Sequence, residues 1–279
     1  MRFFLRGYTI TPHETLNNKI CSTLRKIIII VIALGLGIFY NTNPVSAQQR
    51  KVNNLPTYDR QPYHFGFILA TNQLLFTIKT VDNMSSVKFD ALQTPDFPAD
   101  SSFVYELTGI GRPGFTIGIL GNLRLGDNTD LRFIPALSFG ERALNYNILT
   151  YRDGEGKFVE IEKNITSTLL LFPLEFKYRS HRLNNFAAYV LGGVTYTLDL
   201  ASQKKAQANT NDITVKIQKN DLLLEVGTGV DFYTNYFKFG VQIKMGYGIN
   251  NLIKNEGNIY TEVIDRLNSK VFLLSFTFE

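Results

Sequence analysis

The stretch "YFKFGVQIKMGYGIN" spans Tyr236–Asn250 and sorts its side chains into two sets. Every odd position from Phe237 to Ile249 carries a large apolar side chain. Lysine, glutamine and glycine fill the even positions from Lys238 to Gly248. Because successive side chains of a β-strand point to opposite faces, the stretch predicts a strand with one bulky apolar face and one polar, glycine-rich face.

Seven other segments show the same alternation, with varying clarity, and none shows a sustained helical period of apolar residues. They are His64–Lys79, Gly114–Leu125, Leu131–Leu149, Ile165–Tyr178, Phe186–Leu200, Asp221–Tyr233 and Lys270–Phe278. An even number of such strands is typical of outer-membrane barrels. The sequence therefore predicts an all-β fold: an eight-stranded antiparallel up-and-down transmembrane β-barrel in the outer membrane.

The connecting segments alternate in length, as they do in such barrels. Short turns are expected at Gly126–Asp130, Ser180–Asn185 and Thr234–Asn235, and long polar links at Thr80–Pro113, Thr150–Asn164, Ala201–Asn220 and Asn250–Ser269. We expect the second long link to continue both flanking strands and to turn at Asp153–Gly154.

The two faces of the strands differ in bulk as well as in polarity. The interior of an eight-stranded barrel is just wide enough to be filled by side chains, so glycines there relieve crowding. The bulky set is therefore expected to face lipid and the charged set the lumen. Tyr146, Tyr178 and Tyr247 lie near expected strand ends, as in interfacial girdles. An exported soluble β-sandwich is the alternative.

The beginning of the chain predicts an export signal. Ile27–Tyr40 is an apolar run that follows two basic residues, and Val45 and Ala47 occupy the positions that a signal peptidase reads. A membrane-spanning helix is the alternative, but the run is shorter than the ~20 apolar residues a bilayer requires. Residues 1–47 are therefore expected to form a signal peptide that is cleaved after Ala47.

The rest of the chain is expected to comprise a periplasmic lead-in, residues 48–62, and the barrel domain, residues 63–279. Residues 1–47 hold five basic residues and one acidic residue, so the net charge of +5 for the whole chain falls to +1 without them. This near-neutral balance indicates no nucleic-acid partner. Cys21 is the only cysteine, so the exported part would contain no thiol for disulfides or metal ligation.

Some charged residues occupy the alternate strand positions that are expected to face the lumen, which we call the inward parity. They predict a charge network inside the barrel. A two-residue turn at Thr234–Asn235 would place Asp231 opposite Lys238 and Glu225 opposite Lys244. Opposite charges facing each other avoid the cost of an unpaired buried charge. Four further charges, Glu175, Lys177, Arg124 and Arg132, share the inward parity of their strands and could extend the network. We expect a filled barrel, since eight strands leave too little room for a pore.

Catalytic and ligand-binding patterns are scarce. His64 opens the first strand and His181 lies in a short turn, and neither has a Ser or Asp partner at a diagnostic spacing. The match of "GIGRPG", Gly109–Gly114, to a dinucleotide-binding motif precedes a strand pattern and not the required helix. Cysteine or histidine pairs and calcium loops are absent from the exported part. The sequence predicts no enzyme, no catalytic, cofactor or metal site, and no small-molecule substrate.

Three stretches go beyond a generic barrel. They are "NLPTYDRQPYHFGFILATNQLLFTIK", Asn54–Lys79; "RPGFTIGILGNLRLGDNTDLRF", Arg112–Phe133; and "LRFIPALSFGERALNY", Leu131–Tyr146. They resemble the PorT family of Bacteroidetes, and the similarity runs along essentially the whole exported chain.

The resemblance implies an outer-membrane β-barrel component of the type IX secretion system. Such a component is needed to export cargo with a C-terminal signal domain and, in gliding species, for motility. Other secretion-system subunits and outer-membrane lipid would be its partners, and the family has no established catalytic residues to carry over. Gln48–Pro62 and the loop Thr80–Pro113 are candidate contact segments. The alternatives are a stand-alone adhesive or structural barrel and a hydrolase that acts through His64 at the rim.

Overall fold

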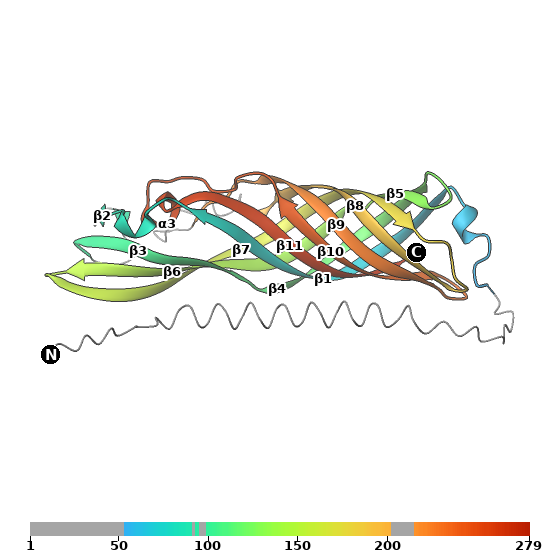
Figure 1. Cartoon of the computed structure of the whole chain (residues 1–279), viewed down its shortest axis with the longest axis horizontal. Helices are drawn as coiled ribbons and strands as arrows, with labels where there is room; N and C mark the ends of the chain where they lie inside the picture. The colour runs from blue at the N-terminus through green and yellow to red at the C-terminus, as the bar shows by residue number, and fades with distance from the viewer. Residues whose placement is uncertain (1–52, 91–92, 95–98, 202–214) are drawn as a thin grey trace, which may run out of the picture. The chain divides into compact units, whose positions relative to one another are not determined.

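The computed structural model describes residues 53–90, 93–94, 99–201 and 215–279 (Figure 1). The predicted signal peptide, the first five residues of the lead-in and most of the predicted link Ala201–Asn220 lie outside these ranges. None of the helices in the described part of the chain is long and apolar enough to cross a membrane.

All described strands belong to one sheet. They are β1 (Tyr63–Thr80), β2 (Phe89–Asp90), β3 (Ser101–Gly111), β4 (Pro113–Arg124), β5 (Thr129–Phe133), β6 (Ala136–Arg152), β7 (Glu155–Arg179), β8 (Phe186–Asp199), β9 (Asn220–Tyr233), β10 (Lys238–Gly248) and β11 (Ile264–Phe278). In the described part of the chain, three short helical turns accompany them: η1 (Tyr58–Arg60), η2 (Met84–Ser86) and α3 (Ile259–Glu262).

The sheet closes on itself, because β1 pairs antiparallel with both β11 and β4. Arg112 alone separates β3 from β4, and both pair with β6; Ile134 and Pro135 separate β5 from β6, and both pair with β7. β3 and β4 therefore form one interrupted strand of the barrel wall, and β5 and β6 form another; we call each such strand a wall strand. With the two-residue β2 outside the wall, the described part of the chain forms eight wall strands, as predicted.

The two ends of the barrel differ in their connections. The turns β4–β5, β7–β8 and β9–β10 meet at the end where β1 begins and β11 finishes, which we call the short-turn end. The connections β1–β3, β8–β9 and β10–β11 and the β6–β7 hairpin meet at the opposite, long-loop end. Figure 1 shows the β6–β7 hairpin reaching beyond the neighbouring strands.

The β6–β7 hairpin turns where the sequence predicts. Residues Asp153 and Gly154 connect the two strands and have positive φ angles of 52° and 85°. Two successive residues with positive φ match a type I′ turn, whose twist suits a two-residue hairpin. Pairing is continuous from Arg152↔Glu155 to Ala136↔Leu171.

Two of the predicted long links were wrong, because they contain strands. The link Thr80–Pro113 contains β3, and the link Asn250–Ser269 contains α3 and the first residues of β11. The reason is that large apolar side chains change from the outer to the inner face of the strands along the barrel. Near the short-turn end the large apolar side chains point outward, such as Phe67 and Leu69. Toward the long-loop end a second set of large apolar side chains, such as Leu144 and Ile148, points inward, so a strand pattern carried on one parity is interrupted.

The inward-facing apolar residues form a core at the long-loop end, the loop-end apolar cluster. Its members are Phe76, Phe89, Val104, Leu144, Tyr146, Ile148, Ile165, Val215, Ile217, Leu252, Ile259, Tyr260, Val263, Ile264 and Leu267. Tyr146, expected in an interfacial girdle, is wholly buried here and donates a hydrogen bond to the Tyr260 carbonyl at 2.9 Å. Tyr178 and Tyr247, in contrast, are exposed on the outer face.

Candidate functional site

A balanced cluster of four cations and four carboxylates fills the lumen on the short-turn side of the loop-end apolar cluster. We call it the lumenal charge cluster, and its members are Arg132, Lys177, Lys238, Lys244, Glu175, Glu225, Asp231 and Glu279. All eight side chains are buried. Buried charges persist in proteins only when they are paired and hydrogen-bonded, so this cluster is interdependent.

Each charge of the cluster has a partner of opposite sign. The Lys177 ammonium donates to the Asp231 carboxylate at 2.5 Å. Lys244 donates to Glu175 at 2.5 Å and to Glu225 at 3.2 Å. The remaining carboxylate, Glu279, lies 2.6 Å from Arg132 and 2.7 Å from Lys238.

Aromatic and amide side chains surround these pairs. The Lys177 ammonium lies 3.7 Å from the centre of the Tyr189 ring, whose hydroxyl donates to Gln242 at 2.9 Å. Arg132 donates to Asn122 at 3.0 Å. These groups replace water around the charges, so the cluster blocks the barrel at this level.

The register predicted for β9 and β10 was wrong by two residues. Lys238 pairs with Tyr233, and Asp231 is opposite Gly240, because the turn is centred on Asn235 and Tyr236. The Thr234 amide donates to the Phe237 carbonyl at 3.0 Å, which closes this turn. A shift of two residues keeps every side chain on its face but changes its neighbours. Asp231 therefore bonds Lys177 and not Lys238, whereas Lys244 still reaches Glu225 diagonally.

Two residues separate the observed cluster from the predicted set. Arg124 has the inward parity but lies at the rim, where it donates to Asp127 at 2.5 Å and to the Gly126 carbonyl at 3.0 Å. Glu279 was not included in the prediction. Its signal was available, because Phe278 belongs to the outward parity and the next residue of an extended strand must point inward.

Glycines make room for the cluster. A Cβ atom at Gly227 would lie 2.9 Å from Cγ of Lys244, and one at Gly240 would lie 3.0 Å from Oδ1 of Asp231. Such distances are shorter than van der Waals contact, so any larger residue would displace these charged side chains.

The described part of the lead-in, residues 53–62, lies against the short-turn end of the lumen. Asp59 accepts hydrogen bonds from Arg179 and, at 2.8 Å, from the Tyr233 hydroxyl. The Tyr58 ring lies 5.0 Å from the Lys238 ammonium and stacks on His64 at 4.0 Å. Burial, and secondarily the nearby Glu279 carboxylate, raises the pKa of the Tyr58 hydroxyl well above its usual value, so the ring caps the cluster as a neutral phenol.

His64 is held in a structural setting. It is buried, and its Nε2 lies 2.8 Å from the Tyr58 carbonyl. His181 is exposed in the β7–β8 turn, as its position predicts. Among the described residues, no group of three or more His, Cys, Asp or Glu side chains could hold a metal ion.

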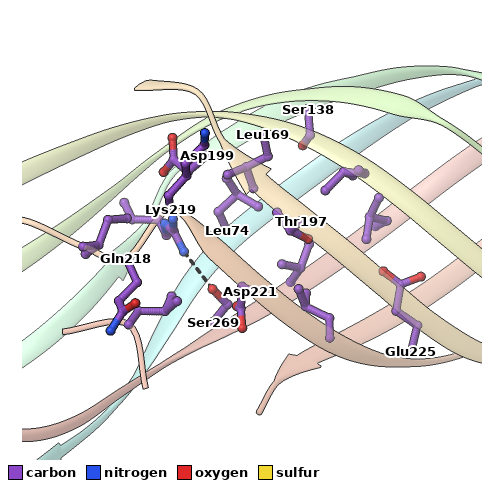
Figure 2. Close-up of a pocket in the computed structure, with 17 residues that line it drawn as sticks. Leu74, Ser138, Leu169, Thr197, Asp199, Gln218, Lys219, Asp221, Glu225 and Ser269 are labelled. Atoms are coloured by element: carbon purple, nitrogen blue, oxygen red, sulfur yellow. Dashed lines mark hydrogen bonds between the residues drawn. The ribbon is translucent and has the colours of Figure 1, made fainter. Parts of the chain in front are cut away.

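A small cavity lies between the lumenal charge cluster and the loop-end apolar cluster (Figure 2). Arg142 lines it and donates to Ser167 at 2.9 Å and to Ser269 at 3.2 Å; the bond to Ser269 is the dashed line in Figure 2. Asp199 and Asp221 also line the cavity. Its volume of about 20 Å³ is enough for about one water molecule. The lumen is therefore filled at this level too.

The chain is similar to several solved structures, including those of NspA and OprG. Neisserial surface protein A (NspA) shares 11% identity over 78% of this chain and 99% of its own, with a TM-score of 0.39. OprG, an outer membrane protein from Pseudomonas aeruginosa, shares 15% identity over 76% of this chain and 95% of its own, with a TM-score of 0.35. Comparison with curated protein sequences gave no match.

A family described as "Outer membrane protein beta-barrel domain" matches residues 34–254, which is most of the chain. The closed sheet, its outward apolar side chains and the alternation of short turns with long loops agree with this match. The chain therefore belongs to the outer membrane protein beta-barrel domain family, and its location is the outer membrane.

Proposed function

We propose that this barrel is a non-catalytic accessory subunit of a protein-export apparatus, the type IX secretion system, and that it acts through contacts with other subunits. The sequence resemblance to the PorT family supports this assignment. In outer-membrane barrels the short turns face the periplasm, so the long-loop end is extracellular.

The observation that carries the proposal is the filled lumen. The half-buried Tyr58 of the lead-in, the lumenal charge cluster and the loop-end apolar cluster follow one another along the barrel, and the two clusters consist of buried side chains. Cargo or solutes would have to disrupt these layers to pass through. A role that depends on the outer surfaces of the barrel suits this interior better than a role as a conduit.

The outer face of the extracellular hairpin offers a contact surface. Phe103, Leu149 and Phe158 are directly opposed across β3, β6 and β7, and Tyr105 and Tyr151 pack beside them. We call these five residues the hairpin aromatic patch. Exposed aromatic side chains that gather in this way are typical of protein contact sites. The patch falls partly within the candidate loop Thr80–Pro113.

A polar belt separates the hairpin aromatic patch from the lipid-facing wall. Arg112 bonds Glu141 at 3.3 Å and Glu162 at 2.6 Å, and Asn145 donates to Glu160 at 2.6 Å. These residues lie between the apolar wall and the patch along the same strands. The patch would therefore meet a protein partner in water and not acyl chains.

Affinity purification from detergent-solubilised outer membrane tests the proposal. Wild-type protein should co-purify with other secretion subunits, and the double variant Tyr105→Ser/Phe158→Ser should lose most of them. Tyr236→Ser removes a 90% exposed aromatic from the opposite end and serves as the matched control. Recovery of the barrel alone, together with normal cargo export in a deletion strain, would refute the assignment.

A stand-alone adhesive barrel is the second candidate, and the hairpin aromatic patch favours it as well, since the patch is extracellular. The two candidates differ in one measurement. Deletion of the gene would abolish cargo export for a secretion subunit, whereas deletion of an adhesin would leave export intact and reduce attachment.

A further inference from the structure

The exposed apolar side chains of the outer wall, from Phe65 and Phe67 to Leu274, form the lipid-facing band, which we call the membrane band. A groove of about 500 Å³ crosses its extracellular half. Its lining residues are Thr71, Asn72, Gln73, Pro113, Ile243, Phe272, Leu273 and Leu274. They come from four adjacent strands, β10, β11, β1 and β4, in two cross-strand rows. One row contains Ile243, Leu274 and Thr71, and the other contains Phe272, Gln73 and Pro113.

The shape of the groove follows from side-chain size. Thr71 is the small residue of its row, and its hydroxyl donates to the Gly114 carbonyl at 3.3 Å and not to a group in the groove. On β4 the residue opposite Thr71 is the exposed Phe115. Ile243, Phe272 and Leu274 form apolar walls that continue the lipid-facing band. An acyl chain would contact the groove on more sides than it could contact a smooth barrel wall.

Cations lie directly above the groove on the extracellular side. Lys270 precedes Phe272 by two residues on the same face, and its ammonium lies 5.2 Å from the centre of the Phe272 ring. Arg266 precedes Lys270 by four residues, which places it nearer the extracellular end, and it is opposite Lys79 on β1. Lys79 is bonded to Asp265 at 2.6 Å, whereas no ion pair forms at Lys270 or Arg266 among the described residues.

The other charges near the groove leave these two cations available. Arg112, beyond Pro113, is neutralised by Glu141 and Glu162. Asp82, which lies near Lys79, and Glu262, which is half-buried at the end of α3, are further carboxylates in this region, and among the described residues neither forms an ion pair with Lys270 or Arg266. Lys270 and Arg266 thus lie above the upper margin of the membrane band without an ion-pair partner among the described residues, which suits an anionic headgroup.

We propose that the groove and the two cations form a binding site for a phosphorylated, multiply acylated lipid of the outer leaflet, namely the lipid A part of lipopolysaccharide. An acyl chain occupies the groove, and the phosphates meet Lys270 and Arg266. The position of the cations on the extracellular side of the groove selects the outer leaflet. A protein segment would not need an apolar groove that opens onto the acyl layer.

Native mass spectrometry of the full-length protein in detergent tests this site, with bis-phosphorylated lipid A as the probe. The dissociation constant should rise about fivefold for each cation removed in Lys270→Ala and Arg266→Ala, since one cation near an anionic surface has about that effect. Filling the groove with Thr71→Phe should weaken binding by a similar factor. Removing both phosphates from the probe should weaken wild-type binding but should change binding to the double cation variant little.

Matched variants on other parts of the barrel provide controls. Thr228→Phe enlarges an exposed threonine on β9 that also bonds a backbone carbonyl, and Lys157→Ala removes an exposed cation from the hairpin. Both should bind lipid A like the wild type. Heat-modifiable migration on gels would verify that each variant is folded. Equal affinity of wild type and the Lys270→Ala/Arg266→Ala variant, or equal affinity for phosphorylated and dephosphorylated lipid, would overturn the proposal.

This inference is independent of the proposed secretion role. The binding measurement uses purified protein and lipid alone, so it can fail while cargo export still depends on the gene. Cargo export can likewise prove normal in a deletion strain while lipid A binding persists.

Discussion

Glu279 stabilises the barrel through both its backbone and its side chain. Its backbone extends the pairing with β10, since its amide donates to the Lys238 carbonyl at 2.9 Å and its carbonyl accepts from the Lys238 amide at 2.8 Å. Its side chain then enters the lumen and accepts from Arg132 and Lys238. Glu279 thus extends the pairing of β11 with β10 and neutralises two buried cations.

Substitution Glu279→Gln should therefore destabilise the barrel strongly. It would leave Arg132 and Lys238 without their carboxylate, and removal of one partner of a buried ion pair typically costs about 3–5 kcal/mol. Urea-induced unfolding in lipid bilayers, followed by loss of heat-modifiable migration, would measure the change. Asp127→Asn removes an exposed carboxylate that pairs with Arg124 and should leave the midpoint unchanged. Equal midpoints for both variants would contradict the role of Glu279.

The Lys177–Asp231 pair allows a test of interdependence. Lys177→Met alone should cost about 3–5 kcal/mol, because it leaves the Asp231 carboxylate buried and unpaired. The double variant Lys177→Met/Asp231→Leu should recover most of this loss, since apolar residues of similar size can replace a buried pair at little cost.

A double-mutant cycle on the same unfolding assay measures the coupling free energy of the Lys177–Asp231 pair. Additive effects of the two substitutions would show that the residues do not depend on each other.

At the scale of single elements, β6 illustrates the inversion of the apolar face. Leu137 is exposed on the outer wall, whereas Leu144, Tyr146 and Ile148 have the opposite parity and are buried. One strand therefore crosses from a zone in which lipid lies outside to a zone in which water lies outside. Because the solvent changes and the pleat does not, the apolar set must change parity.

The β9–β10 register makes a prediction that needs no substitution. In the observed register Asp231 is directly opposite Gly240 in a pair without mutual hydrogen bonds, in which Cα atoms approach to about 4.5 Å. NMR spectra of the protein in micelles should show an Hα–Hα contact between Asp231 and Gly240. An Hα–Hα contact between Phe232 and Phe237 in its place would support a turn at Thr234–Asn235.

At the scale of the whole molecule, the filled interior determines how the barrel can act. The lead-in cap, the lumenal charge cluster and the loop-end apolar cluster occupy successive levels of the barrel. Wild-type protein in planar lipid bilayers should consequently show no stable conductance, whereas an open porin measured in parallel shows discrete steps. Reproducible ohmic steps from the wild type would contradict a filled lumen.

Much of the fold and part of the site could be predicted because strand alternation has a period of two. The parity of Lys244 or Glu175 identifies its face without knowledge of its neighbours, and the count of alternating segments leads to a barrel of eight strands. The same period conceals a shift of two residues, which is why the partner of Asp231 could not be predicted. Parity also cannot show where along a strand the outer surroundings change from lipid to water. For this reason β3 was predicted as part of a link, and Tyr146 was predicted to lie in an interfacial girdle.

The sequence by itself determined that the chain alternates into eight wall strands and which side chains of the membrane band point inward. Only the tertiary structure decided how those side chains meet. Lys177 reaches Asp231 from a strand that is not its neighbour, and Glu279 joins Arg132 across 147 positions of the chain. Pairing across a lumen depends on the register and closure of the whole sheet, and no local pattern of residues records either.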